Sequence, residues 1–138
     1  TGFSKGELWS VDPSGEGVVS DSHVNWKLKR SVSNKPSLVF HDGLIFMIHD
    51  GGVASCVDVE TGKPLWQERV GGNYSASPLL HGDHIYFFSE EGKTTLVRAS
   101  RDFEVIGVNQ LENGFMSSPA VAGSALILRT KTHLYRIE

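Results

Sequence analysis

The sequence contains very little cysteine, since Cys56 is the only one among its 138 residues. A single thiol cannot form an intramolecular disulfide and has no companion cysteine for a structural zinc site. No apolar run approaches the roughly 18 residues needed to cross a bilayer, and no signal peptide begins the chain. Membrane insertion is therefore not expected. The first residue is Thr1 and not Met, which indicates a segment excised or matured from a longer protein.

The sequence also has little excess of one sign of charge over the other. The net charge is −3 and the isoelectric point is near 6.0, so the chain has no broad positive field. A nucleic-acid partner or an anionic membrane surface has little electrostatic support. No stretch maintains an apolar period of about 3.6 residues, whereas short apolar stretches separated by turn residues are common. The sequence therefore predicts an all-β chain.

The most informative feature that is present is a repeat. A Pro, a short apolar segment, a polar turn and a second apolar segment recur after Pro36, Pro78 and Pro119, at intervals of 42 and 41 residues. A constant period in this range is typical of one supersecondary unit that stacks against copies of itself and thereby buries its apolar face. The turns, His41-Asp-Gly43, His81-Gly-Asp83 and Ala122-Gly-Ser124, contain the residues that a tight hairpin requires.

Each repeat is predicted to contain four strands. The first two, A and B, flank the polar turn. The third strands, C, are predicted at 8–12, 54–58, 96–100 and 134–138. The fourth, D, carry Trp26, Trp66 and Ile106 at steps of 40 residues. The chain then holds thirteen strands, or about three blades, in a single domain of residues 1–138, with blade parts at about 7–30, 36–70, 77–110 and 118–138.

The predicted second strands, 44–48, 85–88 and 126–128, are apolar at consecutive positions. Both of their faces must be covered, which favours a β-propeller of stacked four-stranded antiparallel blades over a two-sheet sandwich, in which one face is usually wet. Closed propellers typically need about four to eight blades. The sequence therefore predicts an incomplete propeller.

The stretch Cys56-Val-Asp58-Val-Glu-Thr61-Gly62-Lys63-Pro-Leu-Trp66 resembles the tryptophan-docking repeat of the pyrroloquinoline-quinone (quinoprotein-type) β-propellers, Ala-x-Asp-x-x-Thr-Gly-Lys-x-x-Trp. Cys56 replaces the alanine. The resemblance covers about residues 7–138, but Arg101-Asp-Phe103 stands where Thr-Gly is typical, and Ile106 where Trp is typical. WD-type and kelch propellers are minor alternatives with the same architecture. The residues expected to dock the blades are Asp58, Thr61, Gly62, Trp66, Trp26, Pro36, Pro78 and Pro119.

The resemblance implies a non-catalytic scaffold, or a protein-binding or sensor module, within a larger bacterial protein that is periplasmic or otherwise extracytoplasmic, or is associated with a kinase. It leaves one alternative open, a wall fragment of a quinone-dependent dehydrogenase, which would use pyrroloquinoline quinone and Ca²⁺. The acids Asp12, Asp58, Asp83, Glu90 and Glu91 all fall at strand ends or turns, where hairpin chemistry already explains them. No catalytic, cofactor-binding or metal-binding residue, and no cofactor, is therefore predicted.

Other reactive residues have structural explanations. His41 and His81 occupy the same repeat position, so they are expected about a blade spacing apart, too far to share a metal ion. His81 and His84 are expected to form a solvated pair across one hairpin. No serine lies in a nucleophile elbow. The incomplete first and last blades leave strand edges that seek partners, so the sequence predicts self-association, or closure by the protein's own missing blades.

Overall fold

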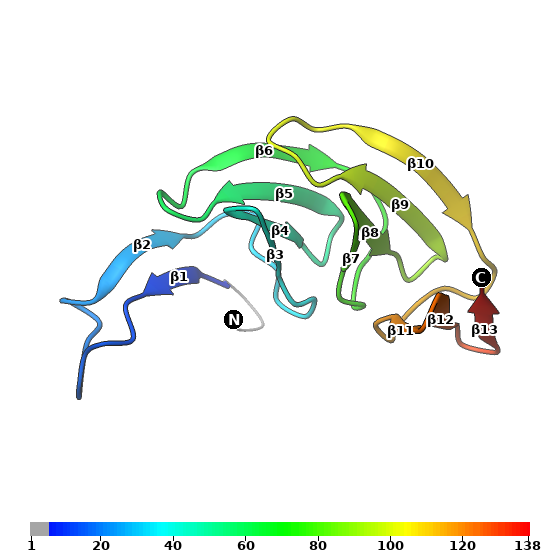
Figure 1. Ribbon diagram of the computed structural model, residues 1–138, viewed down its shortest axis with the longest axis horizontal. Coiled ribbons are helices and arrows are strands. Elements are labelled where there is room, and N and C mark those ends of the chain that lie inside the picture. Colours follow the sequence, from blue (N-terminus) through cyan, green and yellow to red (C-terminus); the bar gives the residue numbers. More distant parts are fainter. Residues whose placement is uncertain (1–5) are drawn as a thin grey trace.

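The computed structural model describes residues 6–138, and these residues form thirteen strands and no helix. The part of the chain from residue 6 onward thus has no helix long and apolar enough to span a membrane. The strands make four antiparallel sheets that follow one another round an open arc (Figure 1). This arrangement confirms the predicted fold class, an all-β chain that forms part of a propeller.

The strands pair in chain order within each sheet, so every sheet is a meander. Strands β6 and β10 run along the convex side of the arc, and β3 and β7 lie on its inner side (Figure 1). Sheet 1 contains β1 (Leu8–Val11) and β2 (Val24–Leu28). Sheet 2 contains β3 (Val39–His41), β4 (Leu44–Ile48), β5 (Val53–Asp58) and β6 (Pro64–Arg69). Sheet 3 contains β7 (Leu79–His81), β8 (His84–Phe88), β9 (Lys93–Arg98) and β10 (Val105–Gln110). Sheet 4 contains β11 (Ala120–Ala122), β12 (Ala125–Arg129) and β13 (Leu134–Ile137).

The hairpin between the first two strands of sheets 2, 3 and 4 has a two-residue turn at the position that the repeat predicts. Asp42 and Gly43 both have positive φ, at 46° and 74°, and Gly82 and Gly123 have φ of 58° and 62°. Backbone of this kind matches the right-handed twist of the paired strands and favours Gly, Asn or Asp. The turn residues therefore fix where each hairpin reverses.

One hydrophobic cluster packs between sheets 2 and 3 and a second one between sheets 3 and 4, and the middle strands of sheets 2 and 3 are covered on both faces. Phe46, Met47 and Ile48 are consecutive on β4 and fully buried. On β8, Phe87 and Phe88 are likewise consecutive and buried. Consecutive buried residues require a neighbour on each face of the strand. On β12 of sheet 4, in contrast, Ile127 is only half-buried, because no further sheet covers that face within the described residues.

One strand begins earlier than predicted. The prediction for residues 96–100 used the apolar pattern, but β9 spans Lys93–Arg98. Thr94 and Thr95 belong to the strand and are buried beside β8 although they are polar. Ala99 and Ser100 lie outside the strand, because their backbone N–H groups bond to Asp83 O and Arg98 O at the start of the next turn.

A ladder of serines joins the sheets at the entry to their first strands. The backbone N–H of Ser37 donates to Ser77 Oγ at 3.0 Å, and the N–H of Ser77 donates to Ser118 Oγ at 2.9 Å. These serines are 40 and 41 residues apart, which is also the spacing of the hairpin turns. Pro36 and Pro78 are buried and Pro119 is half-buried. Pro36 precedes its turn by two residues more than the other prolines do, so the interval of 42 between prolines is not the structural period here.

Candidate functional site

The turn that follows β5 is built on the Asp58 side chain. The backbone N–H and the hydroxyl of Thr61 donate to Asp58 Oδ1 at 3.1 and 3.0 Å, and the N–H of Lys63 donates to Thr61 Oγ1 at 3.3 Å. The N–H of Gly62 donates to the Asp58 carbonyl at 2.9 Å, and Gly62 has a φ of 68°. Side-chain acceptors of this kind stabilise a tight turn by replacing backbone partners.

Trp26 from sheet 1 packs on this turn. Its indole Nε1–H donates to the Val59 carbonyl at 2.8 Å. A Cβ added to Gly62 would lie 2.4 Å from a ring carbon of Trp26, so only glycine leaves room for the indole. Sheet 1 therefore contacts sheet 2 through an aromatic ring that lies flat on glycine backbone.

Trp66 makes the corresponding contact between sheets 2 and 3. Its side chain is buried, and its Nε1–H donates to the Ser100 carbonyl at 3.2 Å. The ring lies 5.0 Å from the ring of Phe103, in the turn between β9 and β10 of sheet 3, and 6.1 Å from the ring of Phe46 in its own sheet, measured between centroids. Buried aromatic clusters of this kind contribute both apolar area and favourable ring geometry. Trp26 and Trp66 thus each donate to a carbonyl of the next sheet, and the docking role expected of them stays a prediction for mutation to test.

The residues that depart from the repeat motif also contact the preceding sheet. Arg101, where the motif has Thr, pairs with Asp58 Oδ2 at 2.7 Å. Phe103 packs on Trp66. Neither contact could be found from the sequence, because both join positions more than 35 residues apart that only the sheet stacking brings together. The substitutions in the third repeat therefore retain the inter-sheet contact through different side chains.

The hydrogen bonds of Asp58 have a pH-dependent consequence. The Thr61 backbone and hydroxyl donors, and then Arg101, hold the pKa of the Asp58 carboxyl below its ordinary value near 3.8. A carboxyl whose pKa is lower in the folded state stabilises the fold above its unfolded-state pKa, and this contribution is lost as the pH falls through the folded-state pKa.

We expect Asp58→Asn to be less stable than the wild-type chain at neutral pH, with a difference that narrows as the pH falls below the ordinary pKa of about 4. Urea unfolding at a series of pH values measures this difference. Thr61→Val, which removes one donor to the carboxylate, should raise the Asp58 pKa in an NMR titration. A stability difference that stays constant from neutral to strongly acidic pH would contradict the assignment.

The third interface lacks a tryptophan, and its register corrects the sequence prediction. Cys56 pairs with Trp66 on neighbouring strands, and the matching pair in sheet 3 is Leu96 with Gly107. Ile106 falls at the register shift of β10 and is 38% exposed. The cause is the turn before β10, which is one residue longer than the turn before β6. Gly107, and not Ile106, therefore stands in the tryptophan position.

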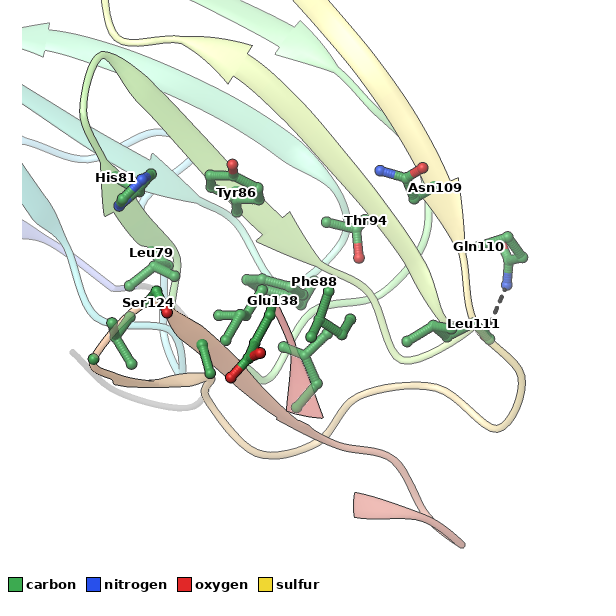
Figure 2. A pocket seen from close by; sticks show the side chains of 16 residues that line it. Leu79, His81, Tyr86, Phe88, Thr94, Asn109, Gln110, Leu111, Ser124 and Glu138 are labelled. Carbon is green, nitrogen blue, oxygen red and sulfur yellow. Dashed lines mark hydrogen bonds between the residues drawn. The ribbon is translucent and has the colours of Figure 1, made fainter. Parts of the chain in front are cut away.

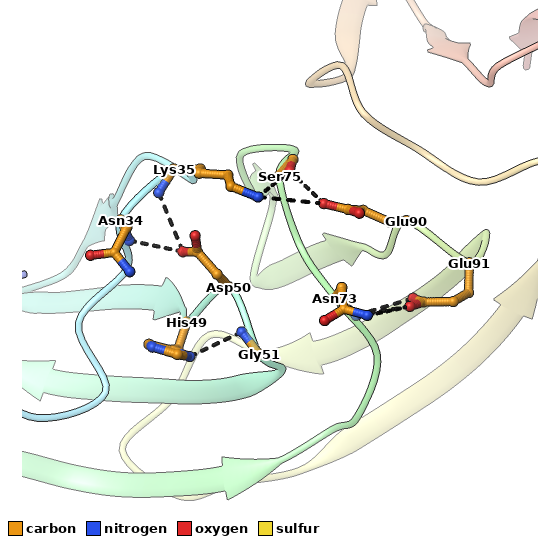
Figure 3. Close-up of polar contacts among 9 residues, drawn as sticks. All are labelled: Asn34, Lys35, His49, Asp50, Gly51, Asn73, Ser75, Glu90 and Glu91. Carbon is orange, nitrogen blue, oxygen red and sulfur yellow. Dashed lines mark hydrogen bonds and ion pairs between the residues drawn. The ribbon is translucent and has the colours of Figure 1, made fainter. Parts of the chain in front are cut away.

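Polar side chains connect sheets 2 and 3 at one end of the blades (Figure 3). Asp50 Oδ1 accepts from the N–H of Asn34 at 2.9 Å, and Lys35 Nζ lies 3.8 Å from Glu90 Oε1. The hydroxyl of Ser75 donates to the same Glu90 oxygen at 2.5 Å. Glu91, the next residue, accepts from the backbone and side-chain nitrogens of Asn73. Glu90 and Glu91 therefore bond to the segment that connects sheets 2 and 3, whereas Asp50 bonds to the segment before β3.

His41, His81 and His84 flank the hairpin turns, as the repeat predicts for these three residues. His81 pairs with His84 across the hairpin of β7 and β8, and His84 Nδ1 lies 2.8 Å from Asp83 Oδ1. Within residues 6–138, no three His, Cys, Asp or Glu side chains converge on a point that could hold a metal ion. Cys56 is fully buried, and its burial raises the pKa of the thiol to about 12, so it is held as an inert thiol and not as a nucleophile.

Comparison with known proteins gives a family and a fold. The profile of the family described as "Outer membrane protein assembly factor BamB" matches residues 4–110. No curated protein sequence matches the chain. The profile covers more than half of the chain, including sheets 1, 2 and 3.

Two solved structures have the same blade architecture. The crystal structure of BamB from Moraxella catarrhalis is 13% identical, with a TM-score of 0.63 over 78% of this chain and 31% of its own. A europium-containing methanol dehydrogenase is 16% identical, with a TM-score of 0.58 over 75% of this chain and 21% of its own. At these identities the likeness concerns the fold. This chain matches less than a third of the length of either protein.

Proposed function

Because this chain belongs to the BamB family of pyrroloquinoline-quinone-repeat β-propellers, we propose that it is part of a propeller that binds other proteins and has no catalytic activity of its own. The family description refers to the assembly of outer membrane proteins, and this supports a periplasmic or otherwise extracytoplasmic location for the protein. The docking contacts hold the sheets in a fixed order along the arc. A stack of sheets whose end strands have unpaired edges is suited to pairing with extended segments of a partner.

The single observation that carries this proposal is the unpaired edge of strand β13 in sheet 4. Within the described residues, β13 pairs only with β12, so its other edge has no strand beside it. Leu134 on β13 is 73% exposed, and Ile137 on the same strand is 45% exposed. An unpaired edge with apolar side chains beside it is a template for an added strand, whose backbone supplies the hydrogen bonds.

The other end of the arc has the same character. On β1, Trp9 is 41% exposed and Val11 is 44% exposed, and β1 pairs only with β2 in the part of the chain that the structure describes. The chain thus has an incomplete sheet at each end of the arc (Figure 1). We propose that a strand pairs at the β13 edge, supplied either by the protein's own missing blades or by a protein partner, a second copy of this chain included.

Size-exclusion chromatography with light scattering tests this proposal on the chain itself. We expect the average mass to rise with concentration between the low micromolar and submillimolar range. Leu134→Lys places a charge beside the β13 edge, where charge opposes edge pairing, and should shift association to concentrations about tenfold higher. Val18→Lys, at a residue that is 93% exposed in the loop between β1 and β2, serves as the matched control. A monomer at every concentration would contradict association through this edge.

The fold likeness to a methanol dehydrogenase favours one alternative, a wall fragment of a quinone-dependent enzyme. The described residues do not fit the Ca²⁺ site of such an enzyme, because Asp58, Glu90 and Glu91 are directed to Thr61, Ser75 and Asn73 and do not face one another around a common point. We therefore propose no cofactor for this part of the protein. Addition of pyrroloquinoline quinone and Ca²⁺ should leave both the absorbance spectrum and the melting temperature unchanged, and a saturable change in either would favour the enzyme.

A further inference from the structure

Strand β10 is the outer strand of sheet 3 and lies on the convex side of the arc (Figure 1). Within residues 6–138 it pairs only with β9, so its other edge has no strand beside it. Sheet 3 has four strands and packs against sheet 2 on one face and sheet 4 on the other. The unpaired edge of β10 therefore lies at the periphery of a complete sheet, away from the incomplete sheets at the two ends of the arc.

The backbone groups that β10 directs outward follow from its hydrogen bonds. The N–H of Leu111 donates to the Gly92 carbonyl at 2.9 Å, so Leu111 is directed toward β9. Val108, Asn109 and Gln110 pair with β9 without a register shift. Because successive residues of an antiparallel strand direct their backbone groups alternately to its two sides, Val108 and Gln110 direct theirs outward. The edge thus presents backbone donors and acceptors to a further strand.

The side chain of Val108 lies on the face of sheet 3 that is directed to sheet 2. Figure 2 shows Asn109 and its partner Thr94 on the face directed to sheet 4. Successive side chains of a strand point to opposite faces, so Val108 belongs to the other face, in the same row as Phe87. Phe87 is buried in the cluster between sheets 2 and 3. Sheet 2 also has four strands, yet Val108 beside it is 57% exposed.

The position of Val108 differs in character from sheet to sheet. Val108 follows the tryptophan position of sheet 3, and the residues that follow Trp26 and Trp66 are Lys27 and Gln67. The same position of the outer strand is thus charged in sheet 1, polar in sheet 2 and apolar in sheet 3.

The outer strands as a whole show the same difference. Strand β2 contains Lys27, and β6 begins with Pro64 and ends with Glu68 and Arg69. Strand β10 has the sequence Val-Ile-Gly-Val-Asn-Gln, with neither a charge nor a proline. All three strands have a register shift just before the tryptophan position, so the bulge does not distinguish β10. Charges and prolines on an edge strand oppose pairing with another chain, and β10 lacks both.

A second copy of β10 suits this edge. Two copies of a strand can pair antiparallel about a two-fold axis, and each chain then needs only one surface for the contact. Because β10 carries no charge, its pairing with itself places no like charges opposite one another within the strand. Its exposed β-branched residues, Val105, Ile106 and Val108, are of the kind that stabilises cross-strand pairs. The charge of Glu104, just before the strand, is already paired with Arg98 Nε at 2.6 Å.

We propose that two copies of this chain pair antiparallel along their β10 edges and so join two four-stranded sheets into one continuous sheet. The valine and isoleucine side chains of one copy then lie beside those of the other. This contact is separate from pairing at the β13 edge, because the two edges belong to different sheets.

Size-exclusion chromatography with light scattering tests the proposal in the Leu134→Lys chain, in which a charge opposes pairing at β13. We expect a dimer that dissociates on dilution into the low micromolar range. Val108→Lys and Val108→Glu, each added to this chain, should raise the dissociation constant at least about tenfold. An equimolar mixture of the two should return it to within about threefold of the starting value, because opposite charges then meet across the pair.

Gln67→Lys is the matched control, because it places the same charge at the same position of β6. It should leave the dissociation constant within about twofold of the starting value. Val108 is exposed, so its variants are expected to fold, and circular dichroism checks this. The proposal is overturned if the Leu134→Lys chain stays monomeric up to submillimolar concentration, or if Val108→Lys dimerises as tightly as that chain. It is also overturned if the mixture associates no more tightly than either variant alone, which would leave the edge to a different polypeptide. Comparison of the Leu134→Lys chain with the wild-type chain tests β13 separately, so the failure of one proposal is distinguished from the failure of the other.

Discussion

Trp66→Ala is expected to lower the free energy of unfolding by about 3–5 kcal/mol, the usual cost of truncating a buried tryptophan. The side chain is 8% exposed and lies between Phe46 and Phe103, so its removal leaves a cavity between two sheets. It also leaves the Ser100 carbonyl without its indole donor. Urea unfolding followed by circular dichroism measures this loss.

Phe40→Ala is the matched control for this prediction. Phe40 is also a large aromatic residue of sheet 2, but it is 63% exposed. Its truncation should change the free energy of unfolding by no more than about 0.5 kcal/mol. A Trp66→Ala effect as small as this would place the indole outside the core and contradict the stacking of sheets 2 and 3.

Gly62→Ala is expected to destabilise the chain by about 2–5 kcal/mol for two separate reasons. The left-handed backbone conformation, at a φ of 68°, costs about 1–2 kcal/mol for a residue with a Cβ. The added Cβ would also lie 2.4 Å from a ring carbon of Trp26 and displace that ring from the turn, which adds an overpacking cost of about 1–3 kcal/mol. Thermal or urea unfolding measures the sum.

Gly43→Ala separates the two costs. Gly43 has a φ of 74°, close to that of Gly62, but a Cβ there would meet no atom within 4 Å. This variant should show only the backbone cost of about 1–2 kcal/mol. If the two alanine variants lost the same stability, the contact between Trp26 and the Gly62 turn would not contribute to docking.

The strands and the hairpin turns could be predicted from the sequence because both depend on residues close together in the chain. The apolar runs of β4 and β8 and the Asp-Gly turn at 42–43 are determined by neighbouring residues. The limit of this reasoning appears at β9, where Thr94 and Thr95 are buried in a central strand although they are polar. Their pairing with β8 decides the strand, and a pattern of apolar residues does not record it.

Contacts between sheets were the part that sequence reasoning predicted least well. The motif residues Asp58, Thr61 and Gly62 form the expected turn, because they are close in the chain. The ion pair of Arg101 with Asp58 and the serine ladder depend on how one sheet lies on the next. The tryptophan position of sheet 3 was wrong by one residue, because a single added residue in a turn moves every later side chain to the opposite face of the strand.

Consecutive sheets stack through indole rings that bond to the next sheet. Hydrogen exchange of the three indole N–H groups, followed by NMR, tests this most directly. We predict slow exchange for Trp26 and Trp66, whose Nε1–H groups bond to Val59 O and Ser100 O, and fast exchange for Trp9, whose Nε1–H bonds to the nearby Glu7 side chain at the surface. Equally fast exchange of all three indoles would contradict the stacked propeller.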